Sequence, residues 1–116
     1  IYTELGQDEK AETALLKALE IDPNYQEAQY NLGAHYVTWA TRLRDEANDM
    51  NPNDFKYDMT LSQSQDLYKK ALVPLEAYIT KQPKDANVLL ILFQINQNVG
   101  NSEKALEYKA RYDAAK

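Results

Sequence analysis

The chain has 116 residues, and its 13 basic and 18 acidic side chains give a formal net charge of −5. This length suits one domain with a modest core. Nucleic acid is not an expected partner, because phosphate binding needs a clustered positive surface and the longest basic run is Lys69-Lys70. The lack of cysteine excludes disulfides, thiolate metal sites and cysteine nucleophiles. The longest apolar run, residues 88–93, is too short for membrane insertion.

The first helical pattern ends just before Pro23. Its small and apolar residues recur at steps of three and four, which predicts a helix that ends at Ile21. The stripe consists of Ala11, Ala14, Leu15, Ala18 and Leu19. We expect Gly6 to close an earlier helix and Asp8 to cap the new one. The start of the chain would then be the end of a helix already under way, so that the natural protein continues upstream.

A second helix is predicted from Tyr25 or Gln26 to about Met50, a length of roughly 37 Å. Its stripe consists of Ala28, Leu32, Tyr36, Trp39, Ala40, Leu43 and Ala47. Residues 51–54 have the composition of a turn. Thr60 and Gln63 match a capping box, which predicts that a third helix begins there.

The third helix is expected to end at Gln82-Pro83 and to be kinked at Pro74. Asp85 can cap a fourth helix, residues 86–99, which Gly100-Asn101 closes. A fifth helix runs from Ser102 to near the C-terminus. Five helical segments without a strand pattern predict an all-α domain.

Several of these positions recur at fixed offsets. The offsets are shared by Gly6, Ala11, Leu15, Ala18, Ile21 and Pro23, then by Ala71, Leu75 and Pro83, and finally by Gly100 and Ala105. They resemble those of the second helix of a tetratricopeptide repeat (TPR), and Leu32-Gly33 followed by Tyr36 resembles its first helix. Small residues such as Ala18 and Gly33 let neighbouring helices approach closely.

The resemblance implies a TPR-like right-handed α-solenoid of antiparallel helix pairs with about five helices. Pro23 and Pro83 are 60 residues apart, 26 more than the 34 of a standard repeat. We place the insertion at about residues 41–66 and expect the second and third helices to form a projecting hairpin tipped by residues 51–57. This layout is similar to a subgroup of TPR proteins from Gram-negative bacteria, many of them exported.

The predicted single domain therefore has three parts. Residues 1–23 are the end of a truncated repeat, residues 24–83 an elongated repeat, and residues 84–116 a C-terminal degenerate or capping repeat. The last part departs from the family pattern, since Phe93 and Asn96 stand where it has Gly and Tyr.

By the same resemblance, the inner face of the first helices would hold an extended polypeptide. The residues expected there are Glu27, Tyr30, Asn31, Ala34, Thr38, Asn87, Leu90, Ile91, Gln94, Gln97 and Asn98. None of them is basic, and only Asn31 matches the clamp with which chaperone-binding TPRs hold an acidic C-terminus. The predicted groove is neutral and partly apolar.

Residues 89–93 (Leu-Leu-Ile-Leu-Phe) are apolar on every side of their helix. Two interpretations are open. Another part of this chain covers Leu90 and Ile91, or these side chains form an exposed patch that binds a partner or makes a homodimer contact.

No catalytic, cofactor or metal site is predicted. His35 is a single imidazole without ligand spacing, so we expect it at a helix–helix contact. Residues 49–53 imitate the start of a calcium-binding loop, but Asp54 and Thr60 replace its required Gly and Glu. The carboxylate pairs Asp8/Glu9 and Asp45/Glu46 lie in turns or on helix surfaces, and no serine has a nucleophile motif.

The sequence therefore indicates a non-catalytic scaffold that binds a protein or peptide through the groove or the hairpin. The alternative is a purely structural C-terminal cap of a longer TPR array, or a homo-oligomerisation module. The partner and the compartment, cytoplasmic or exported to the periplasm, stay open.

Overall fold

The computed structural model describes the backbone of residues 2–115 and the side chains of residues 7–115. Within this part the chain forms five α-helices and no strand. They are α1 (Tyr2–Ile21), α2 (Gln26–Asn48), α3 (Phe55–Lys81), α4 (Ala86–Asn98) and α5 (Ser102–Ala115). The predicted all-α class is confirmed.

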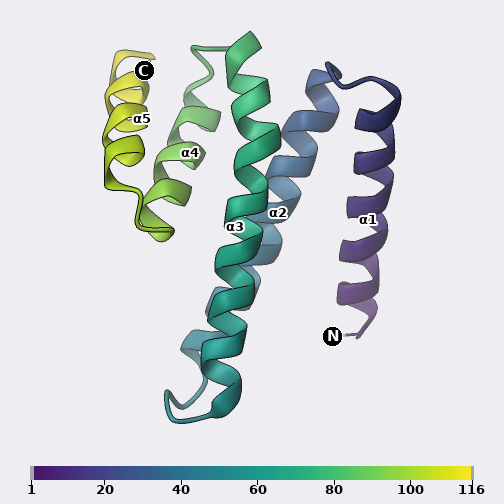
Figure 1. Ribbon diagram of the computed structural model, residues 1–116, viewed down its shortest axis with the longest axis vertical. Helices are drawn as coiled ribbons and strands as arrows, with labels where there is room; N and C mark the ends of the chain where they lie inside the picture. The colour runs from purple at the N-terminus through teal and green to yellow at the C-terminus, as the bar shows by residue number, and fades with distance from the viewer. Residues whose placement is uncertain (1, 116) are drawn as a thin grey trace.

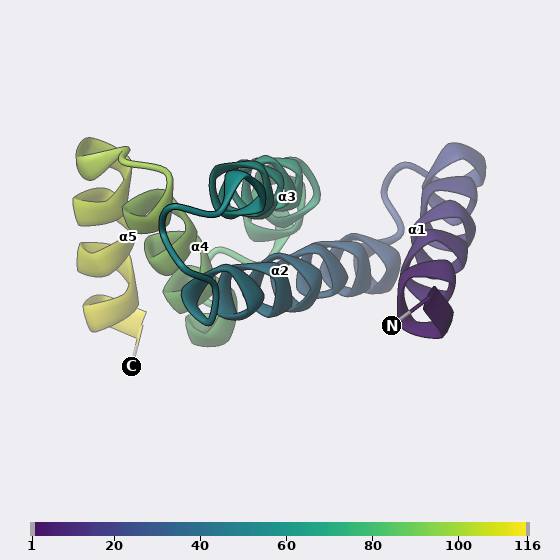
Figure 2. The same cartoon turned by 90° about the horizontal axis from the view of Figure 1, so that it is seen from below.

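Successive helices run antiparallel and pack against each other, most extensively α2 against α3 (Figure 1). The result is a slab of 42 × 33 × 18 Å, with α1 at one end and α5 at the other (Figure 2). With 23 and 27 residues, α2 and α3 are longer than α4 and α5, which have 13 and 14. Their connected ends extend beyond the other helices (Figure 1), so the predicted projecting hairpin is present.

The core lies where α2 and α3 are flanked by the other helices. Leu75, Leu89 and Leu92 are fully buried there. Gly33 lies directly against the Leu75 side chain, and a Cβ on Gly33 would collide with it. The prediction that Gly33 permits a close helix approach is confirmed, because α3 could not lie so near to α2 with a larger residue there.

The predicted boundary near Gly6 is wrong, since α1 runs without interruption from Tyr2 to Ile21. A glycine inside a helix costs only about 1 kcal/mol relative to alanine, and the surrounding helical residues supply enough compensation. Asp8 does not cap a helix. Its carboxylate pairs with the Arg42 guanidinium on α2 instead, which joins the two helices.

The third helix begins earlier than the capping box at Thr60 predicts. Asp54 is its N-cap, and the carboxylate accepts a hydrogen bond of 2.9 Å from the Lys56 N–H. The cap at Asp54 satisfies a free N–H group one turn before Thr60, so the helix includes Phe55 onward. The helix continues through Pro74, which is buried.

The fourth and fifth helices agree with the predicted boundaries to within a residue. Asp85 caps α4 by accepting from the Val88 N–H at 3.3 Å. Gly100 follows α4 with φ of +81°, in the left-handed region that favours glycine. Asn101 accepts from the Lys104 N–H at 3.3 Å and so caps α5.

Candidate functional site

Two hollows lie where α2 and α4 are neighbours, and together they form what we call the α2–α4 groove. The first has a volume of about 430 Å³. It is lined by Gln26, Glu27 and Tyr30 of α2, by Tyr78 of α3, and by Asp85 and Asn87 at the start of α4. An aromatic ring is therefore available beside carboxylate and amide groups.

The first hollow is held in shape by a short chain of contacts. The Tyr30 and Tyr78 rings are 5.5 Å apart at an interplanar angle of 59°, a favourable tilted arrangement. The Tyr78 hydroxyl donates to Asp85 Oδ2 at 2.7 Å. This hydrogen bond, together with burial, raises the pKa of Tyr78 to about 12. Because Asp85 also caps α4, the aromatic pair is fixed to the start of that helix.

The second hollow, of about 420 Å³, lies further toward the projecting hairpin. Its α2 side consists of Val37, Thr41 and Arg44, and its α4 side of Ile91, Gln94, Ile95, Gln97 and Asn98. Tyr68 of α3 also lines it, and its hydroxyl is 2.8 Å from Thr41 Oγ1. The hollow therefore combines an apolar floor with amide groups and one guanidinium.

The structure brings seven of the eleven predicted groove residues to these hollows. Glu27, Tyr30 and Asn87 line the first, and Ile91, Gln94, Gln97 and Asn98 line the second. The other four, Asn31, Ala34, Thr38 and Leu90, line neither hollow. Asn31 and Thr38 are exposed beside the groove, whereas Ala34 and Leu90 are half-buried.

Sequence reasoning missed Arg44, a basic residue that lines the second hollow. On α2, the residues at positions 30, 34, 37, 41 and 44 follow steps of four and three, so they share one face. The predicted groove residues on α2 end at Thr38, and continuing the same steps of three and four would have reached Arg44. Its ion pair with Asp45 has a distance of 3.9 Å between two solvent-accessible groups. Such a pair is weak, and the guanidinium can bind another acceptor.

The apolar run on α4 is covered by its own chain. Leu89 and Leu92 are 0% exposed, and Ile91 and Phe93 are half-buried against the core. Leu90 and Ile91, which the two interpretations concern, are half-buried, so this chain covers them in part. Ile91 contributes apolar surface to the groove.

His35 lies at the contact between α1 and α2, as predicted. Its Nε2 is 2.9 Å from the backbone oxygen of Asp8, and its ring is 5.8 Å from that of Trp39. In the part of the chain that the structure describes, no three acidic or histidine side chains gather to hold a metal ion. None of the described helices has the length and apolar character that crossing a membrane requires.

Comparison with known proteins links the chain to a repeat family. Residues 1–38 match the family model described as TPR repeat, while no curated protein and no solved structure matches the chain. The matched segment contains α1 and the first half of α2, where the sequence pattern is most regular. The match covers 38 of the 116 residues, and the antiparallel helices of the described part are compatible with a helical repeat of this kind.

Proposed function

We propose that this protein is a non-catalytic scaffold that binds a polypeptide along the α2–α4 groove. TPR repeats generally mediate protein–protein interaction. The observation that carries the proposal is the alignment of two hollows on one face of α2, one with an aromatic ring and one with a guanidinium.

The spacing of these groups suits an extended segment. Tyr30 and Arg44 are 14 residues apart on α2, or about 21 Å. An extended polypeptide covers this distance with about six residues. Glu27 and Asn87 flank one end, and Gln94, Gln97 and Asn98 the other.

Each group has a chemical use in such a complex. The amides can both donate to and accept from a peptide backbone, which provides affinity without dependence on the ligand's sequence. Arg44 can form a charge-assisted hydrogen bond with a carboxylate. Tyr30 offers an amphipathic ring to an apolar side chain. The expected ligand is a short extended segment with an apolar residue near one end and an acidic residue near the other.

Selection from a phage library of random short peptides tests this proposal. Peptides selected on the wild-type protein should bind Arg44→Glu and Tyr30→Ala at least about tenfold more weakly, as expected for the loss of a charged or aromatic contact. Lys56→Glu is the matched control, because it makes the same charge change on the projecting hairpin. Loss of binding to Lys56→Glu with Arg44→Glu unaffected would place the ligand on the hairpin and contradict the groove.

A further inference from the structure

Another hollow lies on a different side of α2, between α1 and α3. Two cavities of about 470 and 500 Å³ adjoin there, and Lys70 lines both. We call their combined lining the α1–α3 trough. Its floor is α2, and its walls are α1 and α3, which flank α2 in Figure 1.

The residues that line the trough recur at regular steps on three helices. Its floor residues on α2 are Gln29, Leu32, Tyr36, Trp39 and Leu43. Their steps of three and four make one straight stripe, and the α1 wall repeats this spacing with Glu9, Glu12, Leu16 and Leu19. On α3, Gln63, Lys70 and Ala77 recur at steps of seven. Gln29, Leu32 and Tyr36 of the floor are only 5%, 2% and 4% exposed, so the surface open to an occupant lies on the walls, where Leu16 and Val73 are exposed.

The upper part of the trough is apolar and open. Leu16 is 47% exposed and Val73 is 74% exposed. Both line the same cavity, so they contribute to one apolar surface. The floor below them contains Gln29, which is 5% exposed. Gln29 Nε2 donates to the Pro23 carbonyl at 2.8 Å. Among the described side chains, Gln29 Oε1 is the one buried oxygen or nitrogen atom without a hydrogen-bond partner. Gln29 is thus part of the packed contact between the start of α2 and the turn that precedes it.

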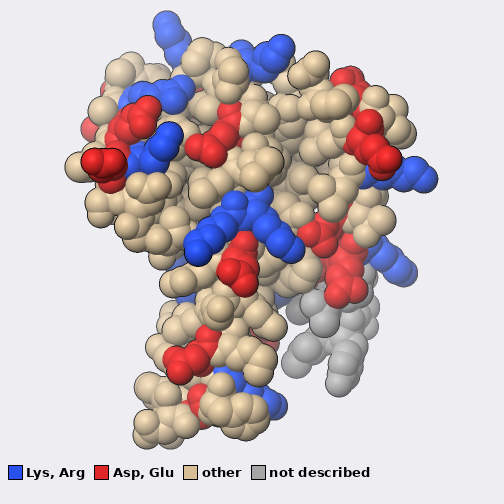
Figure 3. Space-filling model, in the orientation of Figure 1, with Lys and Arg blue, Asp and Glu red and all other residues tan. Residues whose placement is uncertain are grey.

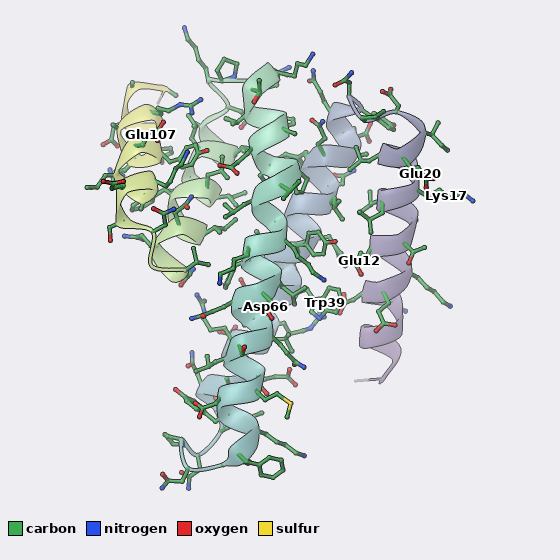
Figure 4. All side chains as sticks on the ribbon, in the orientation of Figure 1. Glu12, Lys17, Glu20, Trp39, Asp66 and Glu107 are labelled. Atoms are coloured by element: carbon green, nitrogen blue, oxygen red, sulfur yellow. The ribbon has the colours of Figure 1, made fainter. Side chains whose placement is uncertain are left out.

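The lower part of the trough is acidic. Glu9 and Asp66 line it, Glu12 lies at the junction with the apolar part, and Lys70 is the one basic group in the lining. Figure 3 shows acidic side chains over α1 with basic ones at its edge, and over the middle of α3 an acidic group below a pair of basic side chains. In Figure 4, Glu12 and Trp39 lie between α1 and α3, whereas Lys17 and Glu20 lie on the outer side of α1. Three carboxylates beside one ammonium select a positively charged occupant.

We propose that the α1–α3 trough binds an amphipathic helix of a partner protein, apolar at one end and basic at the other. The floor from Gln29 to Leu43 is about 21 Å long, which corresponds to a helix of about 14 residues. The apolar end contacts Leu16 and Val73, and its basic end lies beside Glu9 and Asp66. This site is separate from the α2–α4 groove and does not depend on it, because the two stripes of α2 point to different sides.

Synthetic peptides of about 14 residues test this proposal by isothermal titration calorimetry. Each has leucines on one face of one half and lysines on the same face of the other half, and two peptides cover the two possible directions. One of them should bind, and an analogue with glutamate in place of lysine should not. Val73→Glu should weaken binding at least about tenfold. Leu106→Glu on α5 is the matched control, since Leu106 is 70% exposed and lies outside the trough.

The double variant Glu9→Lys with Asp66→Lys gives a second test in case Val73→Glu misfolds. Glu9 and Asp66 are both exposed, so these substitutions should leave the fold intact. It should reverse the preference, so that the acidic analogue binds better than the basic peptide. Failure of both basic peptides to bind, or equal binding to Val73→Glu, would overturn the proposal. A wild-type dimer in sedimentation equilibrium that Val73→Glu makes monomeric would also overturn it, since a second copy would then fill the trough. Arg44→Glu should leave peptide binding in the trough unchanged, which separates this result from the test of the α2–α4 groove.

Discussion

The helix pair α2–α3 has two parts that differ in how they are supported. In the stacked part, α1 lies on one side and α4 on the other, and Leu32, Tyr36, Leu67 and Leu75 are buried. In the hairpin end, which we define as residues 45–62, the two helices have only each other. Within this fully described range Ala47 is the one buried residue, while Phe55 is 78% and Met59 is 52% exposed.

The difference shows that lengthening a helix pair beyond its neighbours adds helix without adding an equivalent core. Each residue beyond the neighbouring helices gains its backbone hydrogen bond but little burial, and burial of apolar surface is the larger source of stability. The hairpin end should therefore open at a lower free energy than the stacked part. This expectation can be tested with substitutions, pH and hydrogen exchange.

The largest expected difference concerns two apolar truncations on the same helix. Leu75→Ala removes a side chain that is 0% exposed and should lower the free energy of unfolding by about 2–5 kcal/mol. Phe55→Ala removes a larger side chain, but because Phe55 is 78% exposed the loss should stay within about 0.5 kcal/mol. Urea denaturation followed by circular dichroism measures both.

One result for Phe55→Ala would contradict the weak support of the hairpin end. A loss of about 2 kcal/mol or more for Phe55→Ala, on the scale of a core truncation, would mean that the tip is packed against something in solution. The hairpin end would then not be the weakly supported part of the molecule.

Alkaline pH should act on the stacked part. Tyr36 and Tyr78 lie there, and Tyr108 of α5 contacts it by donating to Glu76 of α3. Each of the three has a raised pKa. Burial raises the pKa of Tyr108 to about 12, with Glu76 adding to the effect. Burial and the hydrogen bond of 2.5 Å from its hydroxyl to Glu12 also raise the pKa of Tyr36.

The sign follows from the protons that each state holds. Above about pH 10 the unfolded chain releases tyrosine protons that the folded protein keeps, so stability falls as the pH rises. The contribution is complete below that pH and is lost through about pH 12, where Tyr78 and Tyr108 ionise in the folded state. Urea denaturation at several pH values should show this fall. The double variant Tyr36→Phe with Tyr108→Phe should show a shallower one, and an unchanged slope would contradict the assignment to these hydroxyls.

The stacked part is also the more predictable one. Its signals are local and repeated: proline and glycine at helix ends, small residues at the close approach of α2 and α3, and apolar residues at helical steps. Gly33 against Leu75 is an example, because a small residue at that repeat position has one physical use. Asp85 and Gly100 likewise mark the limits of α4, since a side-chain cap and a left-handed residue are local requirements of a helix end.

Other features were missed because a distant contact or the arrangement of several helices decides them. Asp8 has the local features of an N-cap, but Arg42, 34 residues away, takes its carboxylate. Arg44 lies in the elongated part of α2, for which a standard repeat offers no corresponding position. The α1–α3 trough depends on the relative placement of three helices, and each of its stripes reads as ordinary core in the sequence. Gln29 was not singled out because a missing partner cannot be seen in a sequence.

The smallest expected effect concerns the cap of α3 and decides whether the hairpin end opens by itself. Asp54→Ala removes the acceptor of the Lys56 N–H and should cost about 1 kcal/mol at the start of the helix. If the hairpin end opens separately, amide hydrogen exchange in residues 56–62 should accelerate about fivefold, while the amides around Leu75 and the urea midpoint stay unchanged. Ser62→Ala, an exposed change on the same helix, should alter neither. A uniform acceleration along α3, with a matching fall in the midpoint, would show that the two parts unfold as one unit and that the neighbours of the stacked part also support the hairpin end.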